Sequence, residues 1–129
     1  MPLLALLCLG SPAPGASSSQ APDAVRSAQC EHAQTTAAMR ECELSRYKQA
    51  DAAMTAAYRA LLSKLDRTGQ AKLRSAQVAW LKFRDAEADF QADSARGGSL
   101  APLIRTSVLA DLTESRQLQL LKGAKAPPR

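Results

Sequence analysis

The chain has 129 residues, of which 46% are hydrophobic and only 4% aromatic, and its 17 lysines and arginines exceed its 12 aspartates and glutamates by five. This length fits one small domain with an N-terminal extension and excludes a second large core. Abundant alanine and leucine, with few runs of β-branched residues, favour helices over strands. We therefore expect an all-α protein.

The N-terminal segment has the order of a secretory signal. A short apolar run is followed by small, uncharged, proline-containing residues over 11–20. We predict a signal peptide over residues 1–16 and a flexible linker over 17–29, and hence a periplasmic or secreted protein. The apolar run is too short to span a bilayer, so we expect no transmembrane segment, and a disordered tail is the alternative to a signal. The bulky Leu7 before Cys8 argues against a lipoprotein signal.

Two cysteines remain after this segment, Cys30 and Cys42, an even number that suits one disulfide in an exported protein. On one continuous helix they would lie about 18 Å apart, whereas a disulfide requires Cα atoms within about 7 Å. The chain must therefore turn between them. We expect a short segment carrying Cys30 to fold back onto a helix that starts at Thr35 or Thr36. Two free thiols in a cytosolic protein are the alternative.

The first predicted helix spans roughly residues 36–66, where apolar side chains recur every three or four positions. Thr68 and Gly69 then supply a helix cap and a turn. The second predicted helix ends at Gly97 and Gly98, because two consecutive glycines stop a helix. Its predicted inward side consists of Leu73, Ala76, Trp80, Phe83 and Glu87.

The third predicted helix follows a cap at Ser99 and closes at Gly123. Three helices joined by short turns bury their apolar stripes most simply as a small up-down bundle, to which the disulfide pins the N-terminal segment. We predict this domain over residues 30–121, followed by a disordered basic tail over 122–129.

The residue types that carry catalysis do not occur in suitable groups. His32 is the only histidine and has no second ligand at metal spacing. Serines and threonines lack a partnered base, and no Gly-rich phosphate loop is present. We therefore expect no enzymatic activity, no metal and no cofactor. Three of the five net positive charges lie in the tail, and without a basic stripe studded with aromatics we expect no nucleic-acid binding.

The stretch from Gln77 to Asp85 is the most distinctive part of the sequence, because it holds the only tryptophan beside an Arg-Asp pair. A buried arginine needs a carboxylate and further acceptors, so we expect one polar network across the three helices that fixes their register. An exposed contact surface anchored by Trp80 and Arg84 is the alternative, since these residue types dominate interface energetics. The predicted network members are Asp51, Gln77, Trp80, Arg84, Asp85, Thr113 and Arg116.

Basic residues surround the turn predicted between the first two helices, with only Asp66 to offset them. Two of them, Lys72 and Arg74, oppose the dipole of the helix that they begin. Such a positive tip suits contact with an acidic cleft or an anionic surface, and a solvated hairpin end is the structural alternative. The candidate partner-binding residues are Lys64, Arg67, Lys72 and Arg74.

Many of these features recur in one order along the chain. They comprise Cys30, Thr35, Met39, Cys42, Ala50-Asp51, Tyr58, Leu65, Ala76-Gln77, Trp80, Phe83-Arg84-Asp85, Gly97-Gly98-Ser99, Leu112-Thr113 and Arg116. This pattern resembles the LprI-like lysozyme-inhibitor domain family over residues 30 to about 120. The resemblance implies an exported, cysteine-bridged helical domain of bacteria, which in some members inhibits lysozyme.

The chain departs from this family pattern at three positions. The family usually has two further cysteines, where this chain holds Ala88 and Val108. The resemblance implies that those cysteines bridge the second and third helices, so we expect Ala88 and Val108 to face each other as apolar core. The family's glutamate before the methionine is replaced by Ala38, which removes the capping-box partner of Thr35.

These observations lead to one expected function and two alternatives. We expect a protein-binding module whose partner is lysozyme or another envelope protein, with the basic turn entering the acidic cleft that hydrolyses the glycan. A structural or envelope-stress module without inhibitory activity is the first alternative, and burial of Trp80 and Arg84 would favour it. A binder of anionic surfaces, sensitive to salt, is the second. The oligomeric state is left open.

Overall fold

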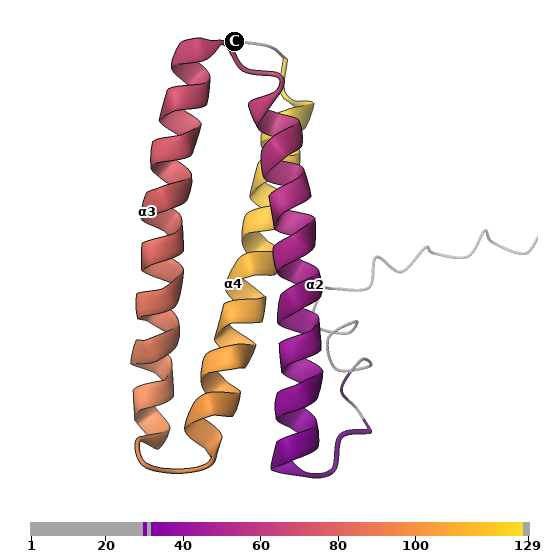
Figure 1. The fold of residues 1–129 in the computed structure, drawn as a ribbon, viewed down its shortest axis with the longest axis vertical. Helices are drawn as coiled ribbons and strands as arrows, with labels where there is room; N and C mark the ends of the chain where they lie inside the picture. Colours follow the sequence, from indigo (N-terminus) through magenta and orange to yellow (C-terminus); the bar gives the residue numbers. More distant parts are fainter. Residues whose placement is uncertain (1–29, 31, 128–129) are drawn as a thin grey trace, which may run out of the picture.

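Three long helices run along a common axis, with α3 antiparallel to both α2 and α4 (Figure 1). The computed structural model describes Cys30 and residues 32–127, and none of these residues lies in a strand. The predicted up-down bundle is therefore confirmed. Its elements are α2 (Thr36–Leu62), α3 (Arg67–Ala92), the short 3-10 helix η1 (Asp93–Ala95) and α4 (Leu100–Lys125).

Side-chain caps set the starts of α2 and α3. Thr35 Oγ1 accepts the backbone N–H of Ala38 at 3.1 Å, so α2 begins where the sequence indicated. α3 begins earlier than expected, because Asp66 accepts the N–H of Gly69 at 2.7 Å and takes the capping role predicted for Thr68. Gly69 therefore lies in the first turn of α3 and not in the loop.

Glycine turns the chain before α4 but does not end that helix. Gly97 has a φ of 77°, a left-handed conformation that glycine adopts without strain, at the turn between η1 and α4. α4 continues through Gly123 to Lys125. The domain was expected to end at residue 121, with a disordered tail from residue 122. Residues 122–125 instead form the last turn of α4.

The predicted signal peptide over 1–16 and linker over 17–29 lie outside the described residues, as do 128–129. Within the part of the chain that the structure describes, no helix combines the length and the apolar character that crossing a membrane requires.

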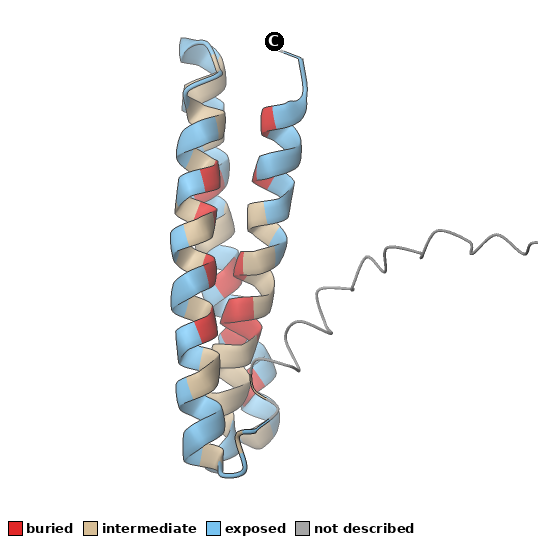
Figure 2. Ribbon diagram, turned by 90° about the vertical axis from the view of Figure 1, so that its right-hand side faces the viewer, coloured by how far each residue is buried: buried red, intermediate tan, exposed pale blue. Residues whose placement is uncertain are grey.

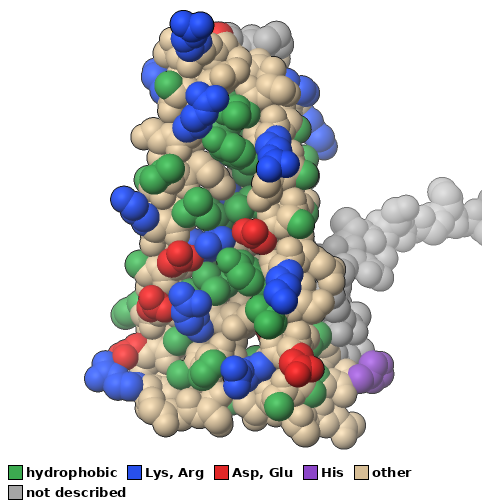
Figure 3. Space-filling view, in the orientation of Figure 1, with side chains coloured by type: hydrophobic (Ala, Val, Ile, Leu, Met, Phe, Trp, Pro, Cys, Tyr) green, Lys and Arg blue, Asp and Glu red, His purple; other side chains and the backbone are tan. Residues whose placement is uncertain are grey.

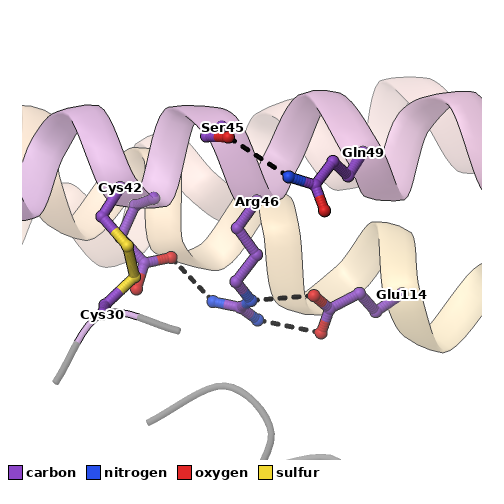
Figure 4. Close-up of a disulfide and its surroundings, with 7 residues drawn as sticks. Cys30, Cys42, Ser45, Arg46, Gln49 and Glu114 are labelled. Carbon is purple, nitrogen blue, oxygen red and sulfur yellow. Dashed lines mark hydrogen bonds and ion pairs between the residues drawn. A yellow bond between two sulfur atoms is a disulfide. The ribbon is translucent and has the colours of Figure 1, made fainter. Parts of the chain in front are cut away.

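The disulfide predicted from the even number of cysteines is present. Cys30 and Cys42 are bonded, and their Cα atoms lie 5.8 Å apart (Figure 4). The bond holds Cys30 beside the early turns of α2, so the chain folds back before that helix as expected.

α4 is the central helix of the bundle. It packs along α2 and also against α3, whereas α2 and α3 meet at few points. The core is divided into two apolar clusters. The buried members of the first come from α2 and α4 and those of the second from α3 and α4, and partly buried side chains of the remaining helix pack against each cluster. Their buried members are Met54, Ala57 and Leu120 in the first, and Ala88, Val108 and Leu109 in the second.

Buried residues lie on the sides of the helices that face one another (Figure 2). On α3, Leu73 and Trp80 of the predicted apolar side pack against the core, whereas Ala76 is exposed and Phe83 is 53% exposed. Gln77 and Arg84 are buried, as the expected polar network required, because α2 and α4 supply partners for them. The expectation that Ala88 and Val108 share an apolar core is confirmed.

Candidate functional site

Arg84 lies at the centre of a polar layer between the two apolar clusters. Its side chain is 8% exposed, its Nε lies 2.9 Å from Asp85 Oδ1, and its Nη1 lies 3.6 Å from Asp51 Oδ1. The guanidinium also lies over the rings of Tyr47 and Trp80, at 5.5 and 5.6 Å from their centroids. Arg84 therefore connects α3 to α2 across a seam where the two helices hardly touch.

A second arginine, Arg116 of α4, completes this layer. Its Nε donates to Gln77 Oε1 at 3.1 Å, its Nη1 donates to Gln119 Oε1 at 3.1 Å, and its guanidinium lies 5.7 Å from the Trp80 centroid. Burial lowers the pKa of Arg116 below its ordinary value. Trp80, which is half-buried, thus contacts the guanidinium groups of two arginines.

The seven predicted network members differ in the contacts that they make. Asp51, Asp85 and Trp80 contact Arg84, and Gln77 and Trp80 contact Arg116. Thr113 is fully buried within α4, but its Oγ1 has no hydrogen-bond partner among the described residues. Six of the seven residues therefore form one connected set, and Thr113 lies in the core without joining it.

The most buried ion cluster surrounds Arg46, which the sequence analysis missed. Its side chain is 3% exposed, and its Nε and Nη2 donate to the two carboxylate oxygens of Glu114 at 2.8 and 2.9 Å (Figure 4). Its Nη1 donates to Glu43 at 2.7 Å, and its Nη2 also donates to Asp111. Burial opposes the charge, but the hydrogen bonds and charges of Glu114 and Glu43 raise the pKa of Arg46. The cluster joins α2 to α4 beside the disulfide.

One sequence signal pointed to Arg46. It precedes Ala50, Met54 and Ala57 at spacings of four, four and three residues, so it continues the buried stripe of α2 by one turn. An arginine on such a stripe needs carboxylates from a neighbouring helix.

The four candidate partner-binding residues have different surroundings. Lys64 Nζ donates to the carbonyl of Ala124 at 2.7 Å, so it holds the end of α4 against the α2–α3 turn. Arg74 Nη2 lies 3.4 Å from Gln70 Oε1 within its own helix. Arg67 and Lys72 are exposed, and neither takes part in an ion pair between described residues.

Charge is segregated along the axis of the bundle. Residues 52–84 and 115–127 hold ten lysines and arginines but a single acidic residue, Asp66. Residues 32–51 and 85–114 hold nine acidic and five basic residues. Because the chain reverses direction at each turn, the first set lies at the end with the α2–α3 turn (Figures 1 and 3). We call the first set the basic half and the second set the acidic half.

A groove lies between α2 and α3 in the basic half, with a volume of about 530 Å³. Figure 3 shows hydrophobic side chains along the centre of this face. Met54, Tyr58, Val78 and Leu81 supply the apolar lining, and Arg74 is among the polar lining residues. The groove exists because α2 and α3 pack mainly on α4 and little on each other.

Metal ligands are not grouped in the described part of the chain. No set of three or more histidine, cysteine, aspartate or glutamate residues there is arranged to hold an ion. His32 is exposed at the surface.

Sequence similarity to known proteins extends over most of the chain. The family model described as "Lysozyme inhibitor LprI" matches residues 27–120. Among curated proteins, the chain is similar to an uncharacterized protein of Rhizobium meliloti (strain 1021), with 28% identity over 128 residues that cover 89% of this chain and 86% of that protein. No solved structure matches the chain at a significant level.

Proposed function

Because the chain belongs to the LprI lysozyme inhibitor family, we propose that it is an exported binding protein, without catalytic activity, that inhibits a lysozyme. The disulfide supports export, since such bonds persist in oxidising compartments such as the periplasm or the extracellular space. A lysozyme hydrolyses its glycan between two carboxylates in a cleft, and a projecting cation complements that charge.

The observation that carries this proposal is the exposure of Arg67 and Lys72 at the α2–α3 turn, where neither forms an ion pair with another described residue. Asp66 caps the first turn of α3, and Lys64 ties the turn to the carbonyl of Ala124. The backbone that presents the two cations is therefore held in place before a partner arrives. Less conformational freedom is lost on binding when the binding element is already ordered.

Turnover of lysozyme on cell-wall suspensions, measured against rising concentrations of the purified disulfide-bonded protein, tests the proposal. We expect inhibition by the wild type and roughly tenfold weaker inhibition by R67Q/K72Q, as for the loss of interfacial charges near a partner's carboxylates. Lys64 is left unchanged because it supports the fold. Unchanged turnover at micromolar wild-type protein contradicts the proposal.

The matched control is R40Q/K48Q, which also removes two exposed basic side chains but takes them from the acidic half. We expect this variant to inhibit like the wild type. Equal losses in both double variants would mean that net charge, and not the tip, is responsible. Circular dichroism establishes that all variants keep the same helix content.

A structural or envelope-stress module is the second candidate function, and the burial of Arg84 between Asp51 and Asp85 favours it. In this case the polar layer serves only to hold the helices together. This second candidate function predicts a normally folded protein that inhibits no class of lysozyme.

A further inference from the structure

The last turns of α4 carry an exposed stripe of two leucines followed by two lysines. Leu118 is 57% exposed and Leu121 is 37% exposed, and Lys122 and Lys125 are exposed beside them. Residues three, four and seven positions apart lie on one side of a helix. These four side chains therefore form one surface, which we call the α4 stripe.

The α4 stripe has no function in the core. On the same turns of the helix, Leu120 packs against Met54 and Ala57 of α2, and Ala124 is also buried. The inward side of α4 is thus occupied by other residues. Leu118 and Leu121 leave apolar surface in water without contributing to the apolar clusters, so the stability of the bundle does not account for them.

From this stripe and the charge of the basic half, we infer that the protein docks on an anionic lipid surface. A helix lies in the interface of a bilayer when apolar side chains reach the acyl boundary and neighbouring cations reach the phosphate groups. Leu118 and Leu121 supply the apolar contact, and Lys122 and Lys125 supply the cations. The proposed lysozyme inhibition is a separate activity, and this docking does not depend on it.

The charge distribution of the whole bundle favours docking through the end that carries the α4 stripe. The α2–α3 turn lies next to the end of α4, as the contact between Lys64 and Ala124 shows, so Arg67 and Lys72 lie at the same end of the bundle as the α4 stripe. Clusters of about four to eight lysines and arginines are typical of recognition of anionic lipids. The acidic half is repelled by such a surface and points away from it.

A lipid surface fits these residues better than a nucleic acid does. Proteins that bind single-stranded nucleic acids stack bases on exposed aromatic side chains, and α4 contains no aromatic residue. Exposed leucines gain nothing from a phosphate backbone, whereas they gain free energy on entering the apolar part of a bilayer.

Sedimentation with phosphatidylcholine vesicles, with and without phosphatidylglycerol, tests the inference. We expect the full chain to bind the anionic vesicles at least about tenfold more tightly than the neutral ones, and to lose binding as salt is raised. K122Q/K125Q and L118S/L121S should each weaken binding to anionic vesicles about tenfold. R40Q/K48Q, in the acidic half, should bind like the wild type.

Two outcomes overturn the inference. Absent binding, or equal binding to both kinds of vesicle, removes the anionic surface as a partner. If L118S/L121S binds the anionic vesicles as tightly as the wild type, and a soluble polyanion such as heparin competes with this binding, then the basic half binds a polyanion and not a lipid surface. Because the leucines are exposed, circular dichroism should show both α4 variants fully folded. Both should still inhibit lysozyme, so a failure here is distinguishable from a failure of the lysozyme proposal.

Discussion

Arg40 and Arg46 lie six residues apart on α2 and have opposite surroundings. Arg40 is exposed, whereas Arg46 is buried among the carboxylates of Glu43, Asp111 and Glu114. The bidentate contact with Glu114 matches the planar fork of a guanidinium, which a lysine does not reproduce. At this position, the neighbours that α4 supplies determine the role of an arginine.

Replacement of Arg46 by alanine should lower the free energy of unfolding by about 3 kcal/mol, because three carboxylates then lie close together without a counter-charge. Two of these carboxylates are about one-third exposed, so we take the lower end of the range for buried pairs. Urea denaturation followed by circular dichroism measures the change. R40A is the matched control and should lie within about 0.5 kcal/mol of the wild type; an equal effect of both variants would refute the assigned role.

Sequence patterns predicted some of these residues and missed others for physical reasons. Chain reach alone implied the turn before Cys42. The need of a buried arginine for a carboxylate implied a contact of Arg84 with Asp51 or Asp85, and Arg84 contacts both. Arg46 was missed because its partners on α4 are 65 and 68 residues away in sequence. Phe83 was placed inward because residue hydrophobicity does not reveal how a helix is rotated against its neighbours.

At the scale of elements, the seam between α3 and α4 is apolar where the family pattern has cysteines. Ala88 is fully buried and lies in one cluster with Val108 and Leu109. This seam and the disulfide at Cys42 lie toward the same end of the bundle. The disulfide ties the segment at Cys30 to α2, whereas apolar packing and polar contacts such as the ion pair of Asp89 with Arg105 hold α3.

The double variant A88C/V108C should form a second disulfide on oxidation and raise the free energy of unfolding by about 3 kcal/mol, as expected for a closed loop of roughly twenty residues. Mobility on non-reducing gels reports the bond, and thermal unfolding with and without reductant reports its effect. The single variant A88C is the control and should gain nothing on oxidation. Failure of the double variant to oxidise as a monomer would mean that the two positions do not face each other.

At the scale of the whole molecule, the order of the helices in space differs from their order in the chain. α2 and α3 are joined by a short turn, yet each packs mainly on α4, which comes last. A fragment of residues 32–99 therefore contains two helices whose common partner is missing. The periodicity of the sequence implied three helices and short turns, but it did not reveal which helix is central, since all three have an apolar side.

We expect the fragment 32–99 to show little helix by circular dichroism, because isolated helices without tertiary packing are marginal in water. Addition of a peptide covering residues 100–127 should restore helix content in proportion to complex formation. A control peptide with L109S and L120S, which alters both apolar clusters, should not. A fragment that is fully helical alone would show that α2 and α3 support each other directly.

The central position of α4 also bears on how the protein is made. During synthesis, the first two helices emerge before the surface that buries them exists, so the growing chain stays open until its last segment appears. An open chain can be threaded through a narrow translocation channel, whereas a folded bundle cannot. The same arrangement predicts that a chain truncated before α4 does not form the bundle. α4 therefore completes the bundle, and the moment at which it is synthesised determines when the chain can fold.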